Sequence, residues 1–251
     1  MRATLTAVIV FGCLIAAVLI GRAIRRVLPG EHVTSDSRDA IKLAMGLVAT
    51  MSALVLGLLV SSAKGAYDTE RSEVIQMASK ISFLGRLFDV YGPEAAAARA
   101  QLREMVEEGI SKFWPGQMQR PTNTAPDMQG GKALYGAIHA LSPQNDAQSA
   151  LKSQAVTLIT DIGQIRSLLV AQSVPSISTA MLVILVLWLV VIFLGFSVLA
   201  PPNATALLAL VVSALAVSGA IFLILELDQP FGGLIGISSE PMVHALDQLA
   251  K

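Results

Sequence analysis

The stretch LAMGLVATMSALVLGLLV, residues 43–60, is an uncharged apolar run inside a longer segment, Asp36 to Tyr91, that contains no proline. The nearest prolines are Pro29 and Pro93. A run of this length and composition crosses a bilayer as a helix. As one helix, at about 1.5 Å per residue, the whole segment would be roughly 80 Å long, well beyond the roughly 30 Å of hydrocarbon. We therefore predict one continuous helix that lies in lipid at first and in water from about Lys64.

The whole chain has the composition of a membrane protein. Of its 251 residues, 54% are hydrophobic and 14% are charged, whereas about 25% of the residues in a soluble domain are charged. Eighteen basic and eighteen acidic residues cancel, so no basic surplus points to nucleic acid. The single cysteine, Cys13, excludes an intramolecular disulfide and a cysteine-cluster metal site.

Three further apolar runs are long enough to span a bilayer: Ala3–Ile20, Ile177–Leu199 and Ala204–Leu225. Three arginines follow the first run: Arg22, Arg25 and Arg26. A cleaved signal peptide would instead have a basic start and a shorter apolar stretch, so we expect a retained anchor.

A bundle of helices is expected between spans two and three. Apolar residues recur at three-and-four spacing through its first helix: Val74, Met77, Ile81, Leu84, Leu87 and Phe88. The Gly92-Pro93 pair ends this helix. Further helices are expected over residues 93–113, 132–141 and 145–173, with a proline- and glycine-rich loop from Trp114 to Gly131.

The sequence thus divides into spans one and two (residues 1–62), the bundle continuous with span two (63–174), spans three and four (175–226), and a tail (227–251). After Glu240-Pro241 the tail holds an amphipathic stretch that either lies at the membrane interface or docks on the bundle. The predicted fold class is an all-α integral membrane protein with four transmembrane helices and a helical-bundle insert between spans two and three.

Basic residues favour one orientation. The connection between spans one and two carries five of them: Arg22, Arg25, Arg26, Arg38 and Lys42. The positive-inside rule places this connection in the cytoplasm. The bundle would then lie outside, in the periplasm if the protein belongs to a bacterial inner (plasma) membrane.

Small residues recur along one face of span two: Gly46, Ala53, Gly57, Ser61 and Gly65. In lipid, such stripes let helices approach one another closely. Two interpretations stay open: helix packing, within the chain or between subunits, and a face that lines a pore.

Acidic residues gather near the predicted membrane boundary. Glu226 and Asp228 follow span four, and Asp68 lies just beyond span two. They either cap the end of the span or pair with cations such as Lys64 or Arg71, or they form the mouth of an ion pathway. A mouth of this kind would bind a hard cation through oxygen ligands or tune ion entry electrostatically. The pattern leaves the identity of any metal unknown.

The sequence contains no recognisable catalytic constellation. The pairs Gly130-Gly131 and Gly232-Gly233 lack the lysine or strand context of a phosphate-binding loop. We therefore expect no enzyme activity and no cofactor.

Two stretches carry a family resemblance. SDSRDAIKL (residues 35–43) leads into GLVATMSALVLGLLVSSAK (46–64), and LELDQPFGGLI (225–235) is followed by SSEP (238–241). Together they resemble bacterial membrane proteins with a bestrophin-like domain of otherwise unknown function. The resemblance covers essentially the whole chain and implies a relation to the bestrophin anion channels. The tail is loosely similar to the acidic segment that senses Ca²⁺ in bestrophins, but it has far fewer carboxylates.

Two functional hypotheses follow. The first is a homo-oligomer that forms an ion channel or channel-like pore, because four spans from one chain enclose little room; the resemblance implies anions as the ions. The alternative is a membrane-anchored helical interaction or scaffold module without transport. The expected partners are the lipid bilayer, further copies of the chain and, for a channel, ions; no nucleic acid is expected.

Overall fold

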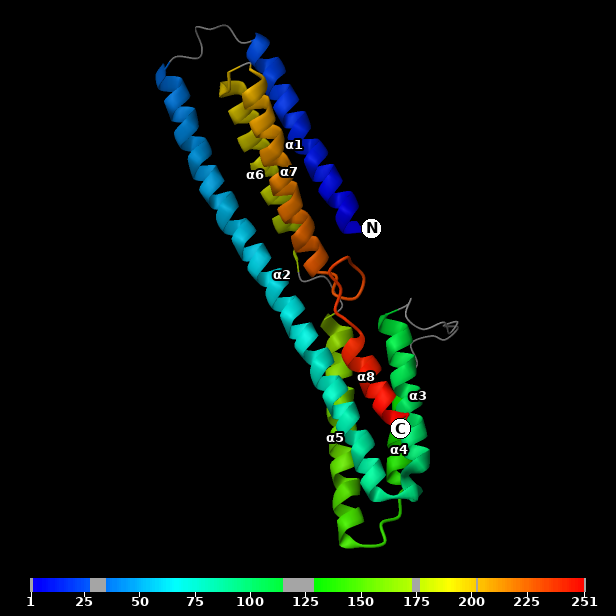
Figure 1. Ribbon diagram of the computed structural model, residues 1–251. Helices are drawn as coiled ribbons and strands as arrows, with labels where there is room; N and C mark the ends of the chain where they lie inside the picture. Colours follow the sequence, from blue (N-terminus) through cyan, green and yellow to red (C-terminus); the bar gives the residue numbers. More distant parts are fainter. Residues whose placement is uncertain (1, 28–34, 115–128, 173–176, 202, 251) are drawn as a thin grey trace. The chain divides into compact units, whose positions relative to one another are not determined.

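The computed structural model describes residues 2–27, 35–114, 129–172, 177–201 and 203–250. The described residues form eight α-helices and one short 3₁₀ helix (Figure 1). They are α1 (Arg2–Val27), α2 (Ser35–Tyr91), η2 (Pro93–Ala95), α3 (Ala96–Phe113), α4 (Gln129–His139), α5 (Asp146–Gln172), α6 (Thr179–Leu199), α7 (Ala204–Leu227) and α8 (Glu240–Leu249). Most of the predicted loop from Trp114 to Gly131 lies outside the described residues.

Four helices are long and apolar enough to cross a membrane: α1, α2, α6 and α7. The all-α prediction is confirmed, and the chain is an integral membrane protein. Helix α2 runs from Ser35 to Tyr91 without a break, as predicted. Helices α3, α4 and α5 lie between the second and third spans in the chain.

The helices form two compact units, which are described separately. The first, here called the membrane unit, comprises residues up to Tyr67, residues 175–229 and residues 233–235. In it, α1, α6 and α7 lie side by side (Figure 1), and α1 packs against both α6 and α7. Leu14, Leu185 and Ile221 are fully buried in their shared core.

Helix α1 approaches α6 closely at Gly21. A Cβ atom added at Gly21 would lie 2.8 Å from both the Leu194 carbonyl oxygen and the Ser197 Cβ. The Ser197 hydroxyl donates a hydrogen bond of 2.6 Å to the Val18 carbonyl. Small residues and a short polar contact therefore join these two helices, as is common between helices in lipid.

The second unit, here called the bundle unit, comprises residues 68–174, 230–232 and 236–251. The predicted apolar face of α2 is confirmed, because all of its members are buried: Val74, Met77, Ile81, Leu84, Leu87 and Phe88. Helix α4 packs against α3 and α5. It begins at Gln129, three residues before the predicted start.

The tail docks on the bundle unit, which is the second of the two expectations for the amphipathic stretch. Helix α8 lies beside α3 (Figure 1). It buries four residues: Met242, Ala245, Leu246 and Leu249. The indole N–H of Trp114 donates a hydrogen bond of 2.7 Å to the Ile237 carbonyl. The rings of Phe113, Trp114 and Phe231 pack against one another beside this hydrogen bond, in tilted and edge-to-face arrangements.

Candidate functional site

Three arginines in the last two turns of α1 line a pocket of about 220 Å³ in the membrane unit. Because Arg25 and Arg26 lie three and four residues after Arg22, the three side chains share one helix face. The opposite wall comes from the end of α6, the turn after it and the start of α7: Ser197, Ala200, Pro201, Ala206, Leu207 and Leu210.

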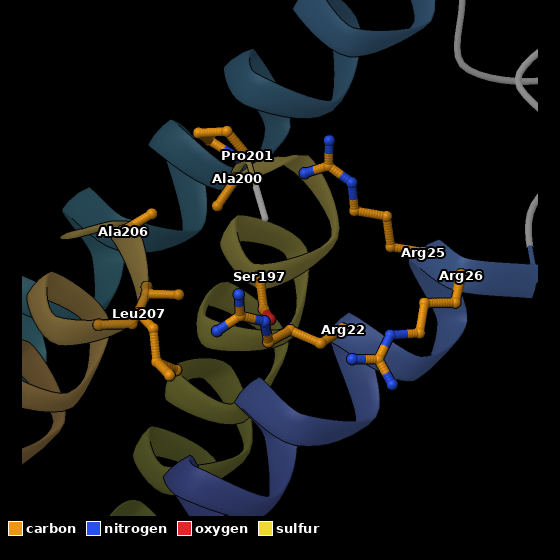
Figure 2. A pocket seen from close by; sticks show the side chains of 9 residues that line it. Arg22, Arg25, Arg26, Ser197, Ala200, Pro201, Ala206 and Leu207 are labelled. Carbon is orange, nitrogen blue, oxygen red and sulfur yellow. The ribbon is translucent and has the colours of Figure 1, made fainter. Parts of the chain in front are cut away.

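Figure 2 shows how the three side chains lie. The guanidinium of Arg22 lies beside Ser197, and that of Arg25 is turned toward Pro201. The Arg26 side chain lies across α1 in this view. Two of the three guanidinium groups are therefore directed toward the α6–α7 wall.

Among the residues that the structure describes, no acidic side chain offsets the positive charge of this pocket. None of the described residues that line it is acidic, and none of the described Asp or Glu side chains forms an ion pair with its arginines. The Nη1 atom of Arg25 is buried and has no hydrogen-bond partner among the described residues. Leaving a buried donor unsatisfied costs about 1–3 kcal/mol, and neighbouring like charges add repulsion.

The carboxyl end of α1 offsets part of this cost, because a helix dipole favours cations in the last turn. It does not give the buried Arg25 donor a hydrogen-bond acceptor. An anion in the pocket would satisfy that donor and relieve the repulsion. The arrangement is therefore suited to binding an anion through guanidinium groups.

In the sequence these arginines predict the orientation of the chain in the membrane, and a pocket beside them was not expected. Their spacing could have indicated a cationic site, because it places three cations on one helix face. The wall around Ser197 and Pro201 had no such signal, because it is about 175 residues away along the chain and is brought close by tertiary packing.

The predicted small-residue face of α2 is exposed: Gly46, Ala53, Gly57, Ser61 and Gly65. A Cβ atom added at Gly46 or Gly57 would meet no other atom within 4 Å. Within the membrane unit, α2 instead buries a neighbouring face: Met45, Ser52, Leu59 and Ala63. Subunit packing and pore lining both stay as predictions for the exposed face.

Glu226 has a defined structural contact. Its side chain is 3% exposed, and its Oε2 atom accepts a hydrogen bond of 2.6 Å from the Leu234 N–H. A Cβ atom at Gly233 would collide with the same carboxylate. Glu226 therefore fastens residues 233–235 to the end of α7.

The other two predicted acidic residues lie in different places. Asp228 is half-buried and caps the carboxyl end of α7. Asp68 belongs to the bundle unit, so its grouping with Glu226 and Asp228 at one mouth stays a prediction. The part of the chain that the structure describes contains no group of three His, Cys, Asp or Glu residues placed to hold a metal ion.

The model of the bestrophin-like domain matches residues 11–242 of this sequence. The chain belongs to the bestrophin-like domain family. No curated protein and no solved structure matches the bestrophin-like chain. The match contains both the arginine pocket and the exposed face of α2. These two features of the bestrophin-like chain bear most directly on ions, since one concentrates positive charge and the other offers small residues along a span.

Proposed function

We propose that copies of this bestrophin-like chain assemble around an axis and form a pathway for anions across the membrane. The observation that carries the proposal is the exposure of the small-residue face of α2, above all at Gly46, Ala53 and Gly57. Family membership supports the choice of anions, because bestrophins are anion channels.

The exposed face of α2 suits a contact between copies better than a contact with lipid. Leucine side chains pack well against lipid chains. Helix α2 exposes three leucines beside the small face: Leu47, Leu54 and Leu58. In lipid, helix association depends on close packing and on hydrogen bonds between helices, and small residues permit both. A second copy placed against Gly57 would make contacts that lipid chains make less well.

The arginine pocket supports the anionic selectivity. Anion pores commonly carry rings of arginine or lysine, and each copy in an assembly would contribute Arg22, Arg25 and Arg26. Under the positive-inside rule, this end of the membrane unit faces the cytoplasm. The proposed location is a bacterial inner membrane, with the bundle unit in the periplasm.

The test compares Gly57→Leu with Gly12→Leu. Gly12 is also exposed, lies on the lipid-spanning helix α1, and has open space around its Cβ position. We expect the wild type and Gly12→Leu to be oligomers by native mass spectrometry and to give discrete currents in planar bilayers. Gly57→Leu should dissociate toward the monomer and lose the current, because the added side chain holds the helices apart.

Selectivity is tested with Arg25→Gln, which keeps hydrogen-bond donors and removes the charge. The oligomer should persist, while the reversal potential in a chloride gradient moves toward lower anion preference. A wild type that stays silent across lipids, ions and voltages would contradict the pathway. An oligomer without flux would instead favour the scaffold alternative.

A further inference from the structure

The bundle unit contains a second, larger pocket of about 770 Å³. It lies among α2, α3, α4, α5 and α8. Its floor is formed by buried apolar side chains that include Ile81, Val106, Ile162 and Met242. The volume is in the range of pockets that hold small molecules, about 300–1,000 Å³.

Glycines make the room in this pocket. Gly109 of α3, Gly136 of α4 and Gly163 of α5 all line it. A Cβ atom at any of these glycines would meet no other atom within 4 Å. Glycine in a helix interior is less favourable than alanine, and these three do not serve close packing between helices. Gly136 and Gly163 are exposed and Gly109 is half-buried, so the three glycines line a hollow that is open to solvent.

Each glycine is accompanied by a cation one turn away on the same helix. Lys112 follows Gly109 by three residues, Arg166 follows Gly163 by three, and Lys132 precedes Gly136 by four. This spacing places the members of each pair on one helix face. All three cations line the pocket, and none of the described lining residues is acidic.

The three cations line the solvent-facing side of the pocket. Lys112 and Lys132 are exposed, and Arg166 is half-buried. Among the residues that the structure describes, none of them has an acidic partner. The pocket thus combines an apolar interior with positive charge at its opening.

We infer that this pocket binds a single-chain amphiphile with an anionic head group, of the chemical class of a long-chain fatty acid. The acyl chain lies over the apolar floor, where burial of its methylene groups stabilises the complex through the hydrophobic effect. The carboxylate lies among Lys112, Lys132 and Arg166, where charge-assisted hydrogen bonds hold it. This inference concerns the bundle unit and stands apart from the proposed ion pathway.

Trp114 offers a local probe, because it lines the pocket and the chain contains only one other tryptophan, Trp188, in α6. The full chain carrying Trp188→Phe is placed in nanodiscs of zwitterionic lipid and titrated with 9,10-dibromostearate, whose bromine atoms quench indole fluorescence on contact. We expect saturable quenching that oleate reverses and that oleyl alcohol, which has no charge, reverses at least tenfold less well. The chain carrying Trp114→Phe reports probe dissolved in lipid and should show no saturation.

Two further variants test the two parts of the pocket. Gly136→Leu fills the hollow and should abolish saturable quenching, with the fold checked by circular dichroism. Replacing the three cations by alanine leaves the apolar floor intact and should raise the half-quenching concentration at least tenfold. Arg86→Ala, which removes an exposed cation of the same unit outside the pocket, should change nothing. Quenching that never saturates, that persists unchanged when the three cations are removed, or that oleyl alcohol reverses as well as oleate does would overturn the inference.

Discussion

Two glycines of the membrane unit lie in opposite surroundings. Gly21 on α1 is buried, and α6 occupies the space where its side chain would be. Gly57 on α2 is exposed, and no atom lies within 4 Å of its Cβ position. The residue type is the same and both helices are long enough to span lipid. What differs is whether another helix of the same chain fills the space.

The comparison shows that a glycine in a span does not by itself indicate a contact within the chain. At Gly21 the partner is visible: the backbone of Leu194 and the side chain of Ser197. At Gly57 the chain supplies no such partner among its described residues, because α2 packs through its Met45 and Leu59 side. A filled position contributes to the fold of one chain, whereas an open one is available to another molecule.

The largest expected effect comes from Gly21→Leu. The added side chain would have to displace the Leu194 carbonyl, which belongs to the backbone of α6 and cannot rotate away. Overpacking of this kind costs typically 1–3 kcal/mol and occasionally more. We expect Gly21→Leu to lower the free energy of unfolding by about 3 kcal/mol, measured by chemical denaturation in detergent micelles.

The matched control for Gly21→Leu is Gly12→Leu on the same helix, where open space surrounds the Cβ position. Its free energy of unfolding should stay within about 0.5 kcal/mol of the wild type. An equal loss of unfolding free energy in the two variants would contradict this explanation, since the effect would then depend on glycine in α1 and not on the contact with α6.

A smaller effect is expected from Gly233→Ala, which extends the comparison to a polar contact. The new methyl group would push the buried Glu226 carboxylate away from the Leu234 N–H. Hydrogen bonds to charged groups contribute about 1.5–3 kcal/mol, so we expect a loss of about 2 kcal/mol in thermal unfolding. Gly232→Ala is the neighbouring control, because open space surrounds its Cβ position. If Gly232→Ala lowered stability as much as Gly233→Ala, the effect would come from reduced backbone flexibility at Gly232-Gly233 and not from the contact with Glu226.

The sequence was sufficient to predict the helices of both units. An apolar stretch without proline gives α2, and three-and-four spacing gives the buried face that includes Val74 and Leu84. These features are local, because each depends on residues within a few turns of one helix. The three α1 arginines are also apparent in the sequence. The positive-inside rule uses them to predict orientation, and it does not predict the pocket that they line.

The sequence was not sufficient to predict which surfaces meet. Ser197 and Val18 are 179 residues apart. No pattern in either segment predicts that the two residues are in contact. A period of four residues along α2 marks a face but does not say which molecule covers it. Similarly, the acidic character of Glu226 suggested an ion mouth, whereas its hydrogen bond to Leu234 depends on how the tail folds back.

The smallest effect is expected from Ser197→Ala, which removes the hydrogen bond to the Val18 carbonyl while keeping the close approach at Gly21. Hydrogen bonds between membrane helices average about 0.6 kcal/mol, so we expect a loss of that size in chemical denaturation, with Ser62→Ala on the exposed surface of α2 as control. If close approach holds α1 to α6, this loss stays well below that of Gly21→Leu. A loss of about 3 kcal/mol or more would assign the contact to the hydroxyl group instead. Whether another helix fills the space beside a glycine would then be a poor guide to which helix faces hold the membrane unit together.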